Sequence, residues 1–284
     1  MLDIRKAYHG KLCADVLGSR GTDKGINIAD TSNKNSRLLA RVLVEKMGFP
    51  LCATPPVGQR AGTLFGKYTK DFIEKSFGRL NHLRPGNWEF SATGGGEVFN
   101  YDQYQHLADL KGFLDDNPRM KASLGFDYLV SPDIVIARAP VSDQKINENE
   151  LLVTENETVS RGTPLRATNQ GDKPKSILHA SISCKWTMRS DRAQNTRTEA
   201  LNLIRNRKGH IPHIVAVTLE PLPTRIASIA MGTGDVDCTY HAALYELIEA
   251  AKESNLDDQM DMLSTLVEGR RLRDISDLPF DLAS

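Results

Sequence analysis

The chain has 284 residues, with 36 basic and 36 acidic side chains, so its formal net charge is zero and does not by itself indicate a nucleic-acid-binding protein. Hydrophobic residues make up 40% and charged residues 25%, the balance of an ordinary globular protein. No stretch approaches the roughly 18 apolar residues of a membrane-spanning helix, and no apolar signal core follows Met1. We therefore expect a soluble cytoplasmic protein that has no membrane partner.

The spacing of hydrophobic residues predicts helices and strands that interleave along the chain. In chain order, we predict helices over residues 2–17, 38–47 and 63–80, a strand that starts at residue 88, a helix over 101–114, strands over 127–139 and 176–186, a helix over 192–206, strands over 213–219 and 225–231, and helices over 240–252 and 256–267. This order predicts an α/β fold in which helices flank a mixed β-sheet core. Because no convincing linker interrupts the pattern, we predict one domain over residues 1–284.

The cysteines are far apart in the sequence: Cys13, Cys52, Cys184 and Cys238. They form no CxxC pair, and no histidine pair at zinc-binding spacing lies near them. We predict reduced, buried thiols, as is usual in the cytoplasm.

Basic side chains concentrate between residues 185 and 208. In this stretch the acidic residues are only Asp191 and Glu199, against Lys185, Arg189, Arg192, Arg197, Arg205, Arg207 and Lys208. A local basic patch suits contacts to DNA phosphates, because each neutralised phosphate releases condensed counterions. On charge alone, the pattern fits a solvated charged face equally well.

Two short motifs suggest a phosphodiester-hydrolysing site, which needs a divalent cation on oxygen ligands and a nearby lysine. Pro132-Asp133 lies in one predicted strand, and Ser183-Cys184-Lys185 lies in the next, with Ser183 where such a layout usually carries an acid. Glu199 can bring its carboxylate to the place of the missing acid if its helix packs against the sheet. Taken alone, the motifs fit a turn proline, a capping aspartate and a strand-end lysine at least as well.

Three charged residues cluster at the start of the helix that carries Glu199: Arg189, Asp191 and Arg192. Arginine pairs bidentately with guanine O6 and N7, and aspartate accepts a hydrogen bond from cytosine N4. The cluster therefore suits reading of G·C pairs in the major groove. A surface ion-pair cluster is the alternative interpretation.

Long runs of the sequence carry a resemblance to one family: residues 82–86, 179–195, 200–209, 226–234, 240–241 and 274–279. They resemble the NgoMIV-like type II restriction endonucleases, a CCGG-core family of the PD-(D/E)XK nuclease superfamily. The resemblance covers nearly the whole chain and is weakest at the N-terminus and around residues 140–175. It implies a restriction-endonuclease-like fold and Mg²⁺-dependent cleavage of double-stranded DNA.

The resemblance implies a role for each catalytic candidate. Asp133 corresponds to the central metal ligand, and Cys184 would give its backbone carbonyl to the same Mg²⁺. Lys185 corresponds to the catalytic lysine, Ser183 stands in the displaced-acid position, and Glu199 corresponds to the relocated acid.

The resemblance also implies which base pairs are read. The CCGG core would be read by Arg189, Asp191 and Arg192, the outer G·C pair by Arg225 with Asp30 and Ser32, and the minor groove by Gln59. These positions imply the site GCCGGC, cut after the first G. Members of the family form dimers that pair back to back, so we expect a homodimer and a homotetramer that binds two DNA copies.

One position departs from the family, which carries a glutamate where this chain has Gly66, in the middle of a predicted helix. Together with Ser183, Gly66 motivates an alternative, a catalytically impaired DNA-binding protein of the same fold. A repair or recombination nuclease without sequence specificity is a further alternative, against which Arg189, Asp191 and Arg192 argue.

Overall fold

The computed structural model describes residues 1–21, 25–92, 98–124, 131–155, 159–170, 174–188, 190–232 and 234–284, with the backbone alone at residues 121, 124, 170 and 190–192. Its helices are α1 (Leu2–Asp15), α2 (Lys34–Met47), α3 (Gly58–Gly78), α4 (Gln105–Asp115), α5 (Pro118–Leu124), α6 (Asp143–Ile146), α7 (Ser190–Asn206), α8 (Pro223–Ala230), α9 (Leu244–Glu253), α10 (Asp257–Glu268) and α11 (Leu278–Ala283). Short 3-10 turns cover Val98–Asn100, Asp102–Tyr104 and Ala167–Gln170. The strands are β1 (Trp88–Ala92), β2 (Ile134–Arg138), β3 (Ile177–Lys185), β4 (His213–Thr218), β5 (Cys238–His241) and β6 (Leu272–Asp274).

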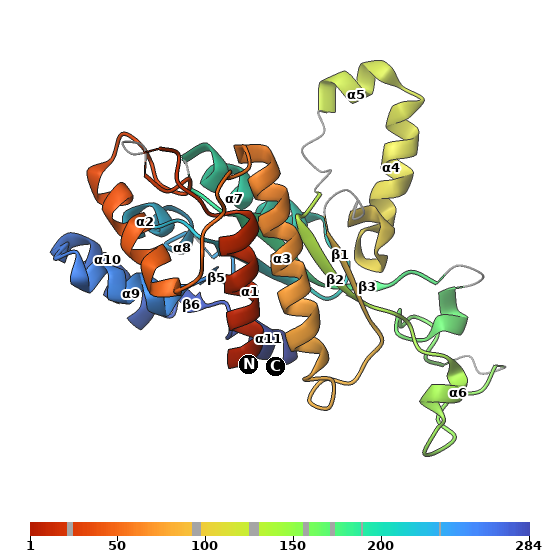
Figure 1. Cartoon of the computed structure of the whole chain (residues 1–284). Coiled ribbons are helices and arrows are strands. Elements are labelled where there is room, and N and C mark those ends of the chain that lie inside the picture. The colour runs from red at the N-terminus through yellow and green to blue at the C-terminus, as the bar shows by residue number, and fades with distance from the viewer. Residues whose placement is uncertain are drawn as a thin grey trace. The chain divides into compact units, whose positions relative to one another are not determined.

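The strands form one sheet in the order β1-β2-β3-β4-β5-β6 (Figure 1). β1 pairs antiparallel with β2, whereas β4 pairs parallel with β5 and β5 parallel with β6. The predicted α/β fold with a mixed sheet flanked by helices is confirmed. β4 and β5 are buried along almost their whole length, which is typical of parallel strands covered on both faces.

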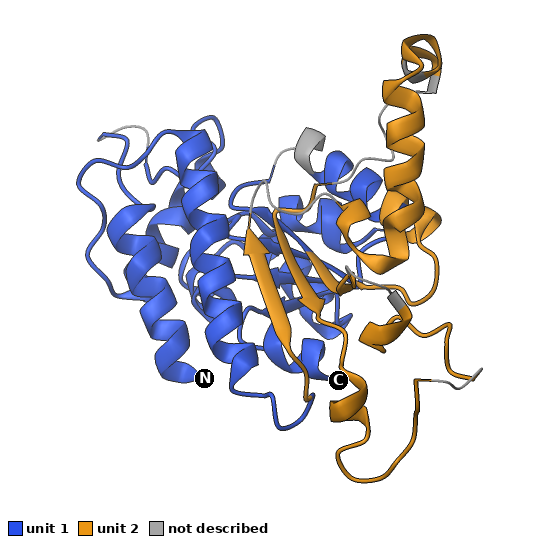
Figure 2. Cartoon of the chain, turned by 90° about the vertical axis from the view of Figure 1, so that its right-hand side faces the viewer, with its two compact units in different colours: residues 1–84, 182–201, 213–284 blue, residues 85–181, 202–212 orange. Residues whose placement is uncertain are grey.

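The chain divides into two compact units, which Figure 2 colours separately. Unit 1 comprises residues 1–84, 182–201 and 213–284, and unit 2 comprises residues 85–181 and 202–212. The single domain expected from the sequence stays a prediction.

Unit 1 contains the parallel strands and the helices that pack on them. A buried ion-pair network fixes its N-terminal helix, because Arg5 donates to Glu246 on α9 (Nη1 to Oε1, 2.7 Å) and to Asp274 at the end of β6 (Nε to Oδ1, 2.9 Å). The hydroxyl groups of Tyr8 on α1 and Thr69 on α3 lie 2.9 Å apart. Since a buried charge is costly unless it is paired, these contacts hold α1 in one position.

Unit 2 contains the β1–β2 pair, α4, α5 and the insertion around α6. The side chain of Gln103 binds the start of β3, accepting from Leu178 N at 2.9 Å and donating to Leu178 O at 2.8 Å. Within the insertion, the guanidinium of Arg166 donates to both carboxylate oxygens of Asp143, at 2.7 and 2.6 Å. The insertion is therefore held by its own polar contacts.

Two elements differ from the sequence prediction. The predicted strand over residues 225–231 is wrong, because this segment forms helix α8. Pro223 occupies the first turn of that helix, where its fixed φ and missing N–H are tolerated. Its buried apolar residues follow helical rather than strand spacing: Ile226, Ile229 and Ala230.

The helix predicted over residues 240–252 starts later than expected, because residues 240 and 241 complete strand β5 and α9 begins at Leu244. The strand predicted over residues 127–139 is found as β2 from Ile134, and residues 127–130 lie outside the described part. The short elements α5, α6, β6 and α11 were not predicted, since each is too short for its periodicity to be read.

Cys13, Cys184 and Cys238 are buried free thiols, as predicted, and Cys52 is a half-buried free thiol. Within the described ranges, every helix is too short or too polar to cross a membrane.

Candidate functional site

The end of β3 carries three of the catalytic candidates, Ser183, Cys184 and Lys185. Ser183 and Cys184 are buried, and Lys185 is half-buried. The Ser183 hydroxyl lies 3.2 Å from the hydroxyl of Thr196 on α7, so this helix packs against β3. Sequence reasoning missed Thr196, which looks like any other polar residue of an amphipathic helix.

Glu199 follows Thr196 on α7 by three positions, so the two side chains share one face of the helix. Glu199 is half-buried. From the sequence, we expected Glu199 to reach the place of the missing acid only if its helix packs against the sheet. The contact between Thr196 and Ser183 meets this condition.

Asp133 directly precedes β2 and is half-buried. It belongs to unit 2, whereas Ser183, Lys185 and Glu199 belong to unit 1. The convergence of these side chains around one phosphate stays a prediction.

The donor set implied for a cation consists of the Asp133 carboxylate and the Cys184 backbone carbonyl. Both are oxygen donors, which suit a hard cation such as Mg²⁺. Among the residues described, no three histidine, cysteine, aspartate or glutamate side chains gather as an all-protein metal site would require. A set of one carboxylate and one carbonyl fits a cation that takes further oxygen ligands from its substrate.

Two of the three inner base-reading candidates, Asp191 and Arg192, lie at the start of α7. Residue 189 falls outside the described residues. Asp191 and Arg192 lie in the first turn of α7, which begins at Ser190, and their side chains are not described. Their predicted location at a helix start is confirmed.

The outer base-reading candidates come together. Arg225 on α8 forms an ion pair with Asp30, which begins the turn before α2. The other carboxylate oxygen of Asp30 accepts from Ser32 twice, from its N–H at 2.9 Å and from its hydroxyl at 2.7 Å. These bonds from Ser32, with the ion pair to Arg225, lower the pKa of Asp30 to about 2. Asp30 is therefore a carboxylate at neutral pH.

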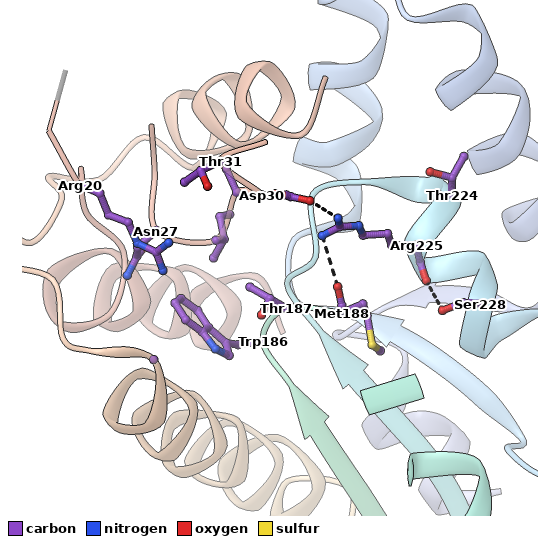
Figure 3. A pocket seen from close by; sticks show the side chains of 13 residues that line it. Arg20, Asn27, Asp30, Thr31, Trp186, Thr187, Met188, Thr224, Arg225 and Ser228 are labelled. Carbon is purple, nitrogen blue, oxygen red and sulfur yellow. Dashed lines mark hydrogen bonds and ion pairs between the residues drawn. The ribbon is translucent and has the colours of Figure 1, made fainter. Parts of the chain in front are cut away.

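Asp30 and Arg225 line a polar cavity of about 790 Å³ within unit 1 (Figure 3). The cavity wall also includes Gly58 at the start of α3, next to the exposed Gln59. The remaining lining residues come from three segments that are far apart in the sequence: Arg20, Asn27, Ile28, Ala29 and Thr31; Trp186, Thr187 and Met188; and Thr224 and Ser228. The cavity thus combines a fixed carboxylate with arginine donors, the groups that read a base-pair edge.

Sequence reasoning also missed Glu220, a fully buried carboxylate in the loop between β4 and α8. It accepts a hydrogen bond from Met188 N at 2.7 Å. A glutamate that directly follows a continuous apolar strand is the one signal that could have identified it.

Comparison with known proteins identifies the family. The sequence model described as "NgoMIV restriction enzyme" matches residues 8–284. The chain is 44% identical over 282 residues to the Type II restriction enzyme NgoMIV of Neisseria gonorrhoeae, covering 98% of this chain and 97% of that protein. The chain therefore belongs to the NgoMIV restriction enzyme family, and it is a type II site-specific deoxyribonuclease with a restriction-endonuclease-like fold.

Proposed function

We propose that the enzyme cleaves double-stranded DNA at GCCGGC, after the first G, in a Mg²⁺-dependent reaction. The observation that carries the proposal is the cluster of Asp30, Ser32 and Arg225. Arg225 is far from Asp30 and Ser32 in the sequence, yet it forms an ion pair with Asp30 at the wall of one polar cavity, and Ser32 donates a hydrogen bond to the same carboxylate. They are the residues that the family resemblance assigns to the outer G·C pair.

In this proposal, the guanidinium of Arg225 donates to guanine O6 and N7, and the Asp30 carboxylate accepts from cytosine N4. Ser32 keeps Asp30 in its charged, acceptor-only form. The CCGG core is assigned to Arg189, Asp191 and Arg192 from the family resemblance, and the location of Asp191 and Arg192 in the first turn of α7 supports this assignment. Gln59, exposed at the start of α3, is assigned to the minor groove.

The catalytic residues would hold and position the scissile phosphate. Asp133 and the Cys184 carbonyl would bind Mg²⁺. When bound, the cation neutralises charge on the phosphate and makes a water nucleophilic. Lys185 would orient that water and stabilise the developing negative charge, and Glu199 would supply the acid that Ser183 lacks. The contact between Ser183 and Thr196 supports this assignment, because it holds the helix that carries Glu199 against β3.

We further propose that the enzyme acts as a homodimer and assembles into a homotetramer. A palindromic site calls for a two-fold symmetric protein, since each subunit reads one half. The insertion of unit 2 exposes adjacent large apolar side chains, Leu151 at 73% and Leu152 at 61% exposure, which supports burial against another chain. The free thiols and the DNA substrate support a cytoplasmic location.

Gly66 favours a second candidate, a sequence-specific DNA-binding protein whose cleavage is impaired. A Cβ at Gly66 would meet no atom within 4 Å, so the position has room for the first atom of a side chain. If the enzyme binds GCCGGC but cuts it poorly, a Gly66→Glu variant that gains cleavage identifies the missing side chain as the cause.

Plasmids that carry no, one or two GCCGGC sites, incubated with Mg²⁺ and resolved on a gel, test the proposal. Discrete products from site-bearing plasmids, formed fastest from the two-site plasmid, support the tetrameric nuclease. Magnesium-independent binding to GCCGGC without product supports the impaired protein. A ladder of products from every plasmid supports a nuclease without sequence specificity, and it would overturn the proposed specificity.

A further inference from the structure

The buried carboxylate of Glu220 connects the two loops from which the base-reading segments start. One loop follows β3 and leads through Met188 into α7. The other follows β4 and leads through Glu220 into α8, which carries Arg225. Both loops belong to unit 1.

Glu220 binds the backbone of both loops. Its Oε2 accepts from Met188 N at 2.7 Å, and its Oε1 accepts from Leu222 N at 3.2 Å. The side chain is fully buried. Because a buried carboxylate without hydrogen-bond donors is costly, the two amides and the carboxylate hold one another in place.

The loop that carries Glu220 is itself fixed from β5. His241 Nε2 lies 3.1 Å from the Glu220 carbonyl, and His241 Nδ1 accepts from Ala243 N at 3.0 Å. Since Nδ1 accepts, Nε2 carries the proton and donates to the carbonyl, which makes His241 a neutral ring. Burial agrees with this state by lowering the pKa of His241 to about 4.

Met188 is held by its side chain and its carbonyl as well as its N–H. Its side chain is fully buried against Ala193 on α7, Ala216 on β4 and Ile229 on α8. Its carbonyl accepts a long hydrogen bond from Arg225 Nη1, at 3.5 Å, and the same guanidinium pairs with Asp30 (Figure 3). A shift of Met188 would therefore move both the start of α7 and the guanidinium of Arg225.

We propose that Glu220 is a positioning residue that fixes Met188, and with it the start of α7, relative to Arg225 on α8, so that recognition of the core and outer base pairs is coupled. The inference rests on the proposed function, which assigns α7 to the core pairs and Arg225 to the outer pair. Glu220 itself contacts no base. Its removal relaxes discrimination at both kinds of base pair together.

Binding selection from a library of duplexes with a randomised six-base-pair site tests this coupling. The full-length protein is mixed with the library without divalent cation, bound duplexes are isolated by gel shift, and their sequences are counted. Wild type is compared with Glu220→Ala, which loses both acceptors, and Glu220→Gln, which keeps one. The control is Asp237→Ala, because Asp237 is an exposed carboxylate that likewise accepts from a backbone N–H, Ile214 N at 2.8 Å, at the opposite end of β4.

We expect Glu220→Ala to lower the preference for the wild-type base pair over the other pairs by about tenfold, at core and outer positions alike, because two buried hydrogen bonds are lost. Glu220→Gln loses one of these bonds and should lower the same preference by about threefold. Asp237→Ala is expected to lower stability and keep the wild-type preferences. Far-ultraviolet circular dichroism identifies the folded variants. If Glu220→Ala does not fold, the Glu220→Gln preferences decide the question.

Wild-type preferences in the folded Glu220 variants, or a loss confined to core or outer positions alone, would overturn the inference. An equal loss in Asp237→Ala would also overturn it, because general destabilisation would then suffice. A wild-type preference for a site other than GCCGGC overturns the proposed specificity instead, and the variants still report on the coupling. Because the selection needs no cleavage, an impaired enzyme leaves the comparison intact.

Discussion

Arg225 and Asp30 are 195 positions apart in the chain and form an ion pair at the wall of a single polar cavity. The pair leaves Asp30 charged, with Ser32 bound to its other oxygen. A guanidinium held by a carboxylate is oriented before DNA arrives, which lowers the entropic cost of recognising a base.

The outer G·C pair provides the first prediction. Arg225→Ala is expected to lose ~1–3 kcal/mol of discrimination between G·C and A·T at the outer positions, because the guanine then lacks its bidentate partner. Relative kcat/KM values on GCCGGC and ACCGGT duplexes measure the loss. Ser32→Ala is the graded control, since it removes only the hydroxyl donor to Asp30. An unchanged ratio in Arg225→Ala would remove this residue from outer-pair recognition.

The proposed metal ligand provides the second prediction. Asp133→Ala is expected to abolish cutting and to spare DNA binding, because the proposed role of this carboxylate is to hold a cation and not to read a base. Removal of Mg²⁺ with a chelator should likewise abolish cutting by the wild type and spare its DNA binding. Gel shift and cleavage on one GCCGGC duplex are the measurements. Asp237→Ala serves as the control for loss of an aspartate elsewhere in the fold. Cleavage retained by Asp133→Ala would contradict the assignment.

Gly66 provides a prediction about stability. It lies in the middle of α3 with a negative φ and with open space where a Cβ would project. Gly66→Ala should therefore raise the free energy of unfolding by about 0.5–1 kcal/mol, the usual difference between the two residues inside a helix. Urea unfolding measures the change.

Gly18→Ala gives the opposite case. A Cβ at Gly18 would lie 2.4 Å from the backbone oxygen of Cys52, so this variant should be destabilised. Stabilisation of Gly18→Ala, or loss of stability in Gly66→Ala, would show that the packing around α1 and α3 differs from that described.

Glu220 provides a prediction about pH. Burial raises its pKa from 4.5 to about 7, although the amides of Met188 and Leu222 and the charge of Arg225 act in the opposite direction. Between pH 4.5 and about pH 7, the folded state keeps a proton on Glu220 that the unfolded state has released. The free energy of unfolding therefore falls as pH rises through this window, and the loss is complete above about pH 7.

Glu220→Gln removes this titration, so the difference in stability between wild type and variant should change by on the order of 1–3 kcal/mol between pH 4.5 and 8, in the direction that favours wild type at low pH. The other groups around Glu220 are Arg225 on α8, Asp30 and His241 on β5. Because His241 is neutral in both proteins, its own opposite contribution cancels in the difference. A difference that stays constant with pH would show that Glu220 is charged throughout.

The long amphipathic helices and the buried strands were predictable from sequence, because their periodicity extends over many residues. α8 was not, since its short run of isoleucine and alanine around Ile226 suits a buried strand as well as a helix, and Pro223 alone marks the helix start. The short strand β6 carries too few residues for any period to be read.

The candidate site was predictable only in part. The motifs around Asp133 and Lys185 suggested a nuclease but fitted ordinary structural roles at least as well, and the family resemblance decided between these interpretations. The contact between Asp30 and Arg225 joins segments that no local pattern relates, and that assignment also came from the resemblance. Glu220 was missed because a charged residue in a loop is normally exposed, and only the packing of β4, β5 and the Met188 loop makes it buried.

The most direct test of the account is the cleavage rate of the wild-type enzyme on two duplexes that share a CCGG core and differ in the outer pair, GCCGGC and ACCGGT, with Mg²⁺ present. We predict cleavage of GCCGGC after its first G, at least about tenfold faster than any cleavage of ACCGGT, because Arg225 and Asp30 are proposed to recognise the outer G·C pair. Equal rates on the two duplexes would contradict it.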